Sequence, residues 1–427
     1  MKKVLKYVIG FFVVLLLVIV SLNIYSNYLD KKIEEIYLKN KVLINHINGL
    51  AEKDKGNVLI EKSMSENNNI LVMGSSELTS PVPENLKNLF PNNLYYGDIS
   101  LVGHAYVQNA LHAVDLGANY ESIKDNNIMI VQSLQWFFDD EINIDGFFSN
   151  FSELQFYEFL HNSKISKENK VYLSKRYIEL ENSNISPINS VLHGRIDVDA
   201  EKYDSILKNV AYGNFINKQT YILARLYSSD SFVGKILYQL TRPYYYFRYK
   251  IMSIQDKYKT YKYLQNITRS NKEDIVNIDW DKIYSDGEDE GKTACTNNNL
   301  FVYDDYYNNY LEDKWDSIQD VYKNTSLLIS KEWQDFEFFL KVSKELDIKP
   351  YIVIMSTNGR YYDYTGLEKE KRDELYNKIE EMSKEYGFEV LNLKDKEYTP
   401  YFYCDVMHLG WKGWPYVVQN TIEHFSK

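Results

Sequence analysis

The chain has 427 residues, a hydrophobic fraction of 44% and a formal net charge of −11 at pH 7. This composition fits a folded protein with a large core, and the acidic balance argues against nucleic acid as a partner, because nucleic-acid binding relies on dense Lys and Arg. The two cysteines, Cys295 and Cys404, are too few for a disulfide framework or a Cys-based zinc site, and the sequence leaves open whether they pair.

The amino-terminal segment has the pattern of a membrane anchor. Residues 7–25 carry no charged side chain, and an uncharged helix of about 19 residues just spans the hydrocarbon core of a bilayer. Lys2, Lys3 and Lys6 precede the run, and such a basic flank tends to stay in the cytoplasm. No good signal-peptidase site follows it. We therefore expect residues 1–26 to form a cytoplasmic tip and one transmembrane helix, with the body outside the cell membrane.

The hydrophobic pattern divides the rest of the chain. Residues 27–65 are charged with helical spacing, which predicts a helical stalk. Residues 66–140 and 326–427 alternate short apolar runs with amphipathic stretches, and we expect these two regions to form one catalytic domain. The expected strands are 70–73, 127–131, 351–355 and 388–393, and the expected helices are 105–116, 367–386 and 411–424. Strands that alternate with helices predict an α/β fold with a doubly wound parallel sheet.

Residues 141–325 have long polar segments rich in Tyr, Lys and Asn, which predict a helical insertion. Within it, the basic aromatic run 242–263 could bind an anionic polymer or lie near lipid headgroups, because Arg and Lys pair with phosphate and Tyr is amphipathic. The alternative is a helix with a Tyr core face and a solvated Lys face. The sequence leaves both open.

Two adjacent serines, Ser75 and Ser76, follow the expected strand 70–73. Open α/β sheets bind their ligands at the carboxyl ends of the strands, so one serine could be a nucleophile, although Ser at such a position also caps helices or turns the chain. A serine nucleophile needs a base and a group that orients the base. Asp405 and His408 supply that pattern in the loop before the last helix. Among the other histidines, His161 follows Glu158 within a helical pattern and is interpreted as a surface or packing pair.

An acyl-transfer site also needs donors for the oxyanion. The backbone N–H of Ser76 is one candidate donor. Gly103, expected at the start of the following helix, is a second, and the side-chain amide of Gln135, just past a strand end, is a third.

The order of these residues resembles the SGNH hydrolase superfamily. Four segments resemble the DltD family more closely: GSSEL at 74–78, SLQWF at 133–137, MSTNGRYYDYTGL at 355–367 and DVMHLGWKGW at 405–414. That family consists of membrane-anchored proteins of teichoic acid D-alanylation in Gram-positive bacteria. The resemblance implies an SGNH-like, flavodoxin-like fold in which Ser76 is the nucleophile, His408 the base and Asp405 its partner.

The resemblance also implies substrates and partners. The acceptor would be the teichoic acid polymer, and the D-alanyl donor would be delivered by the membrane acyltransferase, the small membrane peptide and the carrier protein of the same pathway. We expect no cofactor and no metal. The predicted substrate contacts are Trp136, Asn358, Tyr361, Tyr362 and Trp411. For the loop 358–366 the alternative is that its aromatic residues pack on the core.

Other functions remain open at this point. The same residues fit a thioesterase acting on D-alanyl carrier protein, or an SGNH carbohydrate esterase or O-acetyltransferase of wall polymers. A non-catalytic scaffold that recruits carrier protein or polymer belongs to another class. The immediate acyl donor and the acceptor hydroxyl also remain open.

Overall fold

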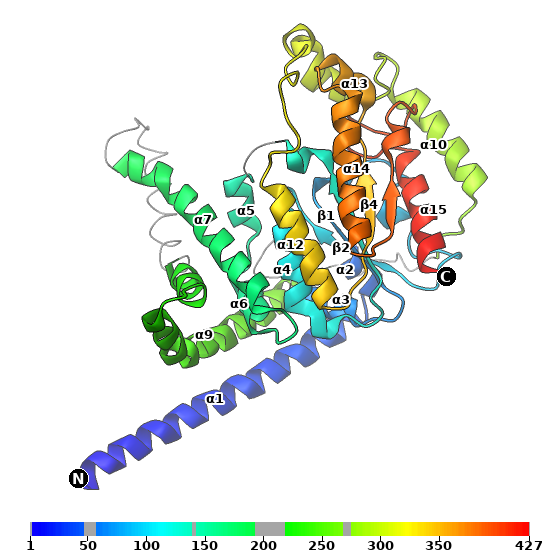
Figure 1. The fold of residues 1–427 in the computed structure, drawn as a ribbon. Coiled ribbons are helices and arrows are strands. Elements are labelled where there is room, and N and C mark those ends of the chain that lie inside the picture. The colour runs from blue at the N-terminus through cyan, green and yellow to red at the C-terminus, as the bar shows by residue number, and fades with distance from the viewer. Residues whose placement is uncertain (1, 47–56, 139–141, 193–217, 268–274, 427) are drawn as a thin grey trace.

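The computed structural model describes residues 2–46, 57–138, 142–192, 218–267 and 275–426. Its centre is a five-stranded parallel sheet with the strand order β2-β1-β3-β4-β5 (Figure 1). The strands are β1 (Ile70–Gly74), β2 (Ile99–Gly103), β3 (Ile128–Ser133), β4 (Tyr351–Met355) and β5 (Val390–Asn392). The predicted α/β fold with a parallel sheet is therefore confirmed, with β2 as a strand that the sequence pattern did not predict.

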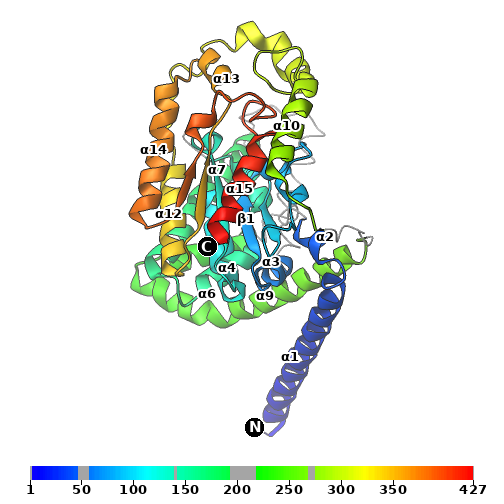
Figure 2. The same ribbon diagram turned by 90° about the vertical axis from the view of Figure 1, so that its right-hand side faces the viewer.

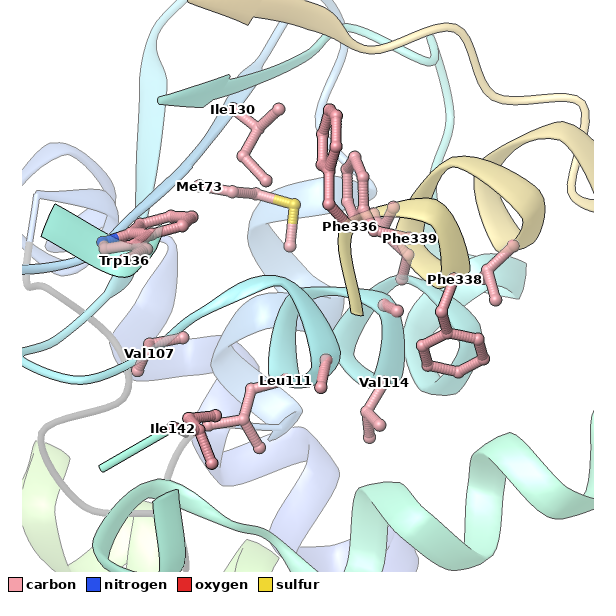
Figure 3. Close-up of a cluster of buried hydrophobic side chains, with 14 of the residues drawn as sticks. Met73, Val107, Leu111, Val114, Ile130, Trp136, Ile142, Phe336, Phe338 and Phe339 are labelled. Carbon is pink, nitrogen blue, oxygen red and sulfur yellow. The ribbon is translucent and has the colours of Figure 1, made fainter. Parts of the chain in front are cut away.

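Helices cover both faces of the sheet, so both faces of the strands are apolar. One face packs against α4 (Asn109–Asn119), α12 (Glu332–Glu345) and α14 (Lys369–Glu385). Figure 3 shows part of this core, where Met73 and Ile130 of the sheet lie near Phe336 of α12. The other face packs against α15 (Gly413–Phe425), with α10 (Trp280–Ala294) beside it.

The described part of 141–325 is mainly helical. Its longer helices are α5 (Ile144–Asn150), α6 (Glu153–His161), α7 (Lys167–Leu192), α9 (Phe232–Leu264) and α10. Side chains of α6 and α7, such as Phe156, Phe159 and Tyr177, are fully buried in the same core as α4 and α12. The helices next to the sheet therefore share its core.

Short elements complete the fold. These are α2 (Lys41–Asn45), α3 (Asn57–Met64), α11 (Asp304–Tyr306), α13 (Gly359–Tyr364) and several short 3-10 segments. Helix α13 occupies most of the region that was expected to be a loop, because Asn358 caps it by accepting a hydrogen bond from the backbone N–H of Tyr361 (3.3 Å). Helix α3 is mostly buried, so the end of the predicted stalk 27–65 lies against the body, while residues 47–56 lie outside the described residues.

Helix α1 (Lys2–Tyr37) projects away from the body (Figures 1 and 2). Apolar side chains along it are exposed, including Val14, Leu16 and Leu17 at 60%, 61% and 60%. No helix in the described ranges has both the length and the apolar character needed to cross a bilayer. The predicted anchor 7–25 includes positions 8, 11, 12 and 15, whose side chains are outside the described ones.

The carboxyl ends of the strands lie on the side of the body away from α1. Helix α13 follows the carboxyl end of β4 and lies at the end of the body opposite to α1 (Figures 1 and 2). Because the strands are parallel, the carboxyl ends of all five lie on that side. Any site at those ends therefore lies far from α1.

Candidate active site

At the carboxyl end of β1, the backbone of Gly74 lies very close to that of Gly103 at the end of β2. A Cβ atom on Gly103 would lie 2.0 Å from the carbonyl oxygen of Gly74, and a Cβ atom on Gly74 would lie 2.8 Å from Oε1 of Glu77. A Cβ atom at position 103 would overlap the backbone of Gly74, and one at position 74 would displace the side chains of Glu77 and Leu78. The chain can therefore turn sharply from β1 into a short 3-10 segment, Ser76–Thr79, at the carboxyl end of the sheet.

The two adjacent serines have different partners. Ser75 is 2% exposed, and its hydroxyl donates to the carbonyl oxygen of His104 (3.1 Å). Ser76 is only partly buried, and its Oγ lies 3.0 Å from Nε2 of His408. Ser75 therefore fixes the turn, whereas the hydroxyl of Ser76 faces a histidine.

Asp405 holds His408 in the orientation that Ser76 needs. The Nδ1 of His408 lies 2.7 Å from Oδ2 of Asp405, so a proton on Nδ1 leaves Nε2 free to accept one from Ser76. The other carboxylate oxygen, Oδ1, accepts hydrogen bonds from the backbone N–H of Met407 (2.8 Å) and of His408 (2.7 Å). The carboxylate is thus fixed by the same loop that carries the histidine.

The loop that carries His408 is joined to the turn that carries Ser76. Tyr403 and Leu409 form an antiparallel bridge, and the N–H of Cys404 donates to the carbonyl oxygen of His408 (3.0 Å). The hydroxyl of Ser80 donates to the carbonyl oxygen of Leu409 (2.9 Å). The structure therefore brings Ser76, His408 and Asp405 together from two segments far apart in sequence.

A family model for the DltD protein matches residues 49–426. The chain belongs to the DltD family. It is 26% identical over 379 residues to Protein DltD of Bacillus subtilis, which covers 87% of this chain and 86% of that protein. It is 24% identical to Protein DltD of Staphylococcus aureus and 22% identical to that of Lacticaseibacillus rhamnosus, with 85% and 81% of those proteins covered. DltD family membership confirms the resemblance predicted from sequence and implies a part in the D-alanylation of teichoic acids.

Charges around His408 shift its pKa. Burial lowers the pKa of His408, but the hydrogen bond and charge of Asp405, together with the charge of Glu77, outweigh it and raise the pKa above the usual value. The histidine therefore takes up a proton more readily than an exposed histidine does.

Glu77, which directly follows Ser76, is a site residue that the sequence analysis did not identify. It is fully buried, its Oε1 accepts a hydrogen bond from the N–H of Ser75 (2.6 Å), and Oε2 has no hydrogen-bond partner among the described residues. Burial raises the pKa of Glu77 to about 7, although the backbone hydrogen bonds and the charge of His408 lower it. A carboxyl directly after the two serines, in a segment that is otherwise small or apolar, was the signal that could have revealed it.

The predicted oxyanion donors are placed differently from expectation. Gly103 is the last residue of β2 and pairs with Gly74 in the sheet, whereas α4 begins only at Asn109. The expectation that Gly103 starts a helix is wrong, because the close contact with Gly74 continues the strand to that point. Gln135 lies just after β3 and is half-buried, and its side-chain amide makes no hydrogen bond in the part of the chain that the structure describes.

The five predicted substrate contacts are all buried. Trp136, Asn358, Tyr361, Tyr362 and Trp411 are at most 9% exposed. Their aromatic rings pack into the two cores, and the amide of Asn358 donates to the carbonyl oxygen of Leu300 (2.7 Å). The burial of Tyr361 and Tyr362 agrees with the alternative given for the loop 358–366, that its aromatic residues pack on the core.

Exposed aromatic residues at this end of the sheet come from other segments. Tyr106, in the loop after β2, is 54% exposed and has a φ of 72°, a strained conformation for a residue other than glycine. Tyr306 is half-buried, and its ring lies near that of the exposed Tyr310, tilted by 35° with the ring centroids 5.3 Å apart. Burial and the charge of Asp405 raise the pKa of Tyr306, so its hydroxyl lies within the field of that carboxylate.

Within the described residues, no group of three or more His, Cys, Asp or Glu side chains is arranged to hold a metal ion. Cys295 and Cys404 are both buried as free thiols. The chemical groups at this site are the hydroxyl of Ser76, the imidazole of His408 and the carboxylate of Asp405, joined in that order by hydrogen bonds.

Proposed function

We propose that this protein is a serine-dependent acyltransferase that passes D-alanyl groups to teichoic acid through an acyl-enzyme. The single observation that carries the proposal is the chain of contacts from Ser76 Oγ to His408 Nε2 (3.0 Å) and from His408 Nδ1 to Asp405 Oδ2 (2.7 Å). That chain of contacts is the arrangement that activates a serine hydroxyl. Membership of the DltD family supplies the substrate class.

The reaction has two halves, and the triad serves both. Ser76 Oγ attacks the carbonyl carbon of a D-alanyl ester or thioester while His408 takes the hydroxyl proton, and the backbone N–H of Ser76 and the amide of Gln135 are the candidate donors to the oxyanion. The tetrahedral intermediate collapses, and His408 returns the proton to the leaving alcohol or thiol. A polymer hydroxyl then gives its proton to His408 and attacks the acyl carbon, and as the second tetrahedral intermediate collapses His408 returns that proton to Oγ of Ser76.

We further propose that the body has an SGNH-like, flavodoxin-like fold. The strand order β2-β1-β3-β4-β5, with the nucleophile after β1 and Asp405 and His408 before α15, supports this assignment. The aromatic residues that could contact the acceptor are Tyr106, Tyr306 and Tyr310, since they are at least partly exposed near the triad segments.

We propose that α1 anchors the protein in the cell membrane with the body outside. The exposed apolar side chains along α1 and the basic residues before residue 7 support this topology. The D-alanyl donor would then reach Ser76 from the membrane acyltransferase, small membrane peptide and carrier protein of the pathway. Protease treatment of intact cells should remove the body, and full protection of the body would overturn the topology.

Cells carrying Ser76→Ala beside cells carrying Ser75→Ala test the function. Loss of a triad member costs about 10⁴- to 10⁶-fold in rate, so Ser76→Ala should remove most wall D-alanine. Ser75→Ala should leave a measurable D-alanine level, because its hydroxyl bonds only to a backbone carbonyl. A normal D-alanine level with Ser76→Ala would favour a scaffold. Purified protein that releases acetyl groups faster than D-alanyl groups would favour a carbohydrate esterase.

A further inference from the structure

Helix α9 lies along the side of the body from which α1 leaves (Figures 1 and 2). Its carboxyl half is fixed to α1 just beyond the uncharged run 7–25. The ammonium group of Lys257 donates to Oγ of Ser26 (3.0 Å) and to Oδ2 of Asp30 (2.8 Å). Leu264 is buried in the same small cluster as Ile33 of α1. The position of α9 relative to the predicted anchor is therefore set by direct contacts.

One side of α9 is packed against the body. Tyr245 is 3% exposed, and its ring lies near that of Tyr157 of α6, with centroids 6.0 Å apart. Arg248 donates to both carboxylate oxygens of Glu153 at the start of α6 (2.9 Å each). These contacts fix the rotation of α9 about its axis, so that the opposite side faces outward.

The outward side of α9 is apolar and aromatic. Its exposed members are Phe232 (78%), Val233 (64%), Ile236 (43%), Leu237 (45%), Leu240 (72%), Tyr244 (48%) and Phe247 (44%). At 100° per residue all of these positions except Leu237, which lies at about 80° from Tyr245, fall on the half of the helix opposite to Tyr245. A surface helix in water normally exposes its polar side. A continuous row of exposed apolar side chains therefore indicates a surface that a membrane or another molecule covers.

Basic side chains accompany this row. Helix α9 carries seven Lys and Arg residues and a single acidic residue, Asp256, which is buried. Arg242 and Lys250 are exposed, and the ammonium group of Lys250 lies 5.2 Å from the ring centroid of Tyr249. The local charge is thus opposite to the net charge of −11 of the whole chain. Large apolar and aromatic side chains flanked by Lys and Arg are typical of helices that lie in the headgroup region of an anionic bilayer.

We infer that α9 lies on the surface of the bilayer that α1 enters, with its apolar row in the interface and its basic side chains on lipid phosphates. This inference rests on the membrane anchoring proposed above. An anionic polymer would also attract Arg242 and Lys250, but it would give Phe232 and Leu240 no apolar surroundings. The contact of Lys257 with Ser26 places α9 where the uncharged run ends, which is where the interface would be.

Depth measurements on the full-length protein in vesicles test this inference. An environment-sensitive fluorophore is attached to Leu240→Cys, and matched probes are attached to Val14→Cys in the uncharged run and to Val321→Cys at the opposite end of the body. The unsubstituted chain is the labelling blank, because Cys295 and Cys404 are 8% and 1% exposed. Nitroxide groups on lipids, placed either near the headgroup or deep in the acyl chain, report depth by quenching.

We expect the probe at 240 to be quenched by the shallow nitroxide, the probe at 14 by the deep one, and the probe at 321 by neither. Quenching at 14 without quenching at 240 would overturn the inference and leave the anchoring intact. Absence of quenching at both would overturn the anchoring as well. If soluble polyglycerol phosphate changes the fluorescence of the probe at 240, and lipid nitroxides do not quench that probe in vesicles, the surface would be assigned to a polymer.

A charge reversal tests the role of the basic side chains. Arg242→Glu with Lys250→Glu should abolish any increase in quenching at 240 when phosphatidylglycerol is added to phosphatidylcholine vesicles. The matched control, Lys282→Glu with Lys323→Glu, makes the same change in net charge at exposed positions away from α9. Equal effects of the two pairs would contradict a specific role for α9.

Discussion

The reactivity of the Ser76 hydroxyl depends on the charges that its neighbours hold. His408 must be neutral to take the proton from Ser76, yet Asp405 and Glu77 favour its charged form. In the proposed mechanism, the charges that raise the pKa of His408 also stabilise the imidazolium that forms when His408 takes up the proton. A change at either carboxyl group should therefore alter both the rate and its pH dependence.

We expect Asp405→Asn to lower the rate of D-alanyl transfer by roughly 10⁴-fold, because the imidazolium loses its carboxylate. The acid limb of the pH–rate profile should also move to lower pH. The substitution removes the main cause that raises the pKa of His408, and burial, which lowers it, remains. The measurement is the pH dependence of kcat/KM, with Asp395→Asn at an exposed position as the control. An unmoved acid limb would show that His408 is not the titrating base.

Glu77 should act as a positioning residue for the nucleophile turn. Glu77→Ala leaves the N–H of Ser75 buried and without a partner, which costs about 1–3 kcal/mol of unfolding free energy. Glu77→Gln keeps an oxygen that can accept that hydrogen bond and should restore most of the stability. Denaturant unfolding of the two variants makes the comparison. Equal stability of both variants would mean that the hydrogen bond to Ser75 does not hold the turn.

At the scale of elements, the site depends on how two loops are joined. The turn after β1 and the loop before α15 meet through Ser80, whose hydroxyl donates to the carbonyl oxygen of Leu409. No residue of the triad contributes to that bond. The alignment of Ser76 with His408 can therefore be changed without touching either side chain.

We expect Ser80→Ala to lower the transfer rate without moving the acid limb, because the bonds between Asp405 and His408 stay in place. The buried carbonyl of Leu409 loses a partner, and the free energy of unfolding should fall by about 1–3 kcal/mol. Ser317→Ala, whose hydroxyl bonds to a local backbone carbonyl on an exposed 3-10 segment, is the control. A rate equal to that of the unsubstituted protein would mean that the hydrogen bond from Ser80 to Leu409 is not needed to align Ser76 with His408.

The sequence predicted those elements whose apolar runs are long or bounded by clear turns. Strands β1, β3, β4 and β5 and the triad segments fall in such places. Strand β2 was missed because Ser100 interrupts its apolar run, so that its pairing with β1 is needed to recognise it. The sequence left open whether Tyr361 and Tyr362 contact substrate or pack on the core, because it does not specify which side of a short helix they occupy, and the structure has both side chains buried. The same limit hid Tyr106, since a positive φ outside glycine has no sequence signature.

At the scale of the whole molecule, several buried carboxyl groups make stability depend on pH. Burial is the main cause that raises the pKa of Glu77 to about 7 and the pKa values of Asp115 and Glu158 to about 8. In the unfolded chain these groups ionise near pH 4. Unfolding therefore releases protons between about pH 4 and pH 8, and the free energy of unfolding falls as the pH rises through that window.

We expect the melting temperature of the protein to decrease between about pH 5 and pH 8, with each such group contributing at most about 1.4 kcal/mol per pH unit. Asp115→Asn should make this dependence shallower, because the amide does not ionise. Asp305→Asn, at an exposed position, should leave the slope as it is. Thermal unfolding of the three proteins across the pH range makes the comparison, and parallel curves would contradict the assignment of Asp115.

The direction of the sheet determines which part of a teichoic acid polymer can reach Ser76 in the proposed topology. Ser76 follows β1 at the carboxyl end of the sheet, and that end faces away from α1 (Figure 1), so in the proposed topology the chemistry takes place above the lipid surface. Repeat units next to the lipid end of a teichoic acid would pass below the site, whereas units further along the polymer could reach it. We therefore expect D-alanine to be sparse near the lipid end, which stepwise degradation of the polymer from its free end would measure. D-alanine spread evenly down to the lipid would mean that the acceptor bends back or the body tilts, so the distribution of D-alanine along the polymer would report the orientation of the proposed active site relative to the membrane.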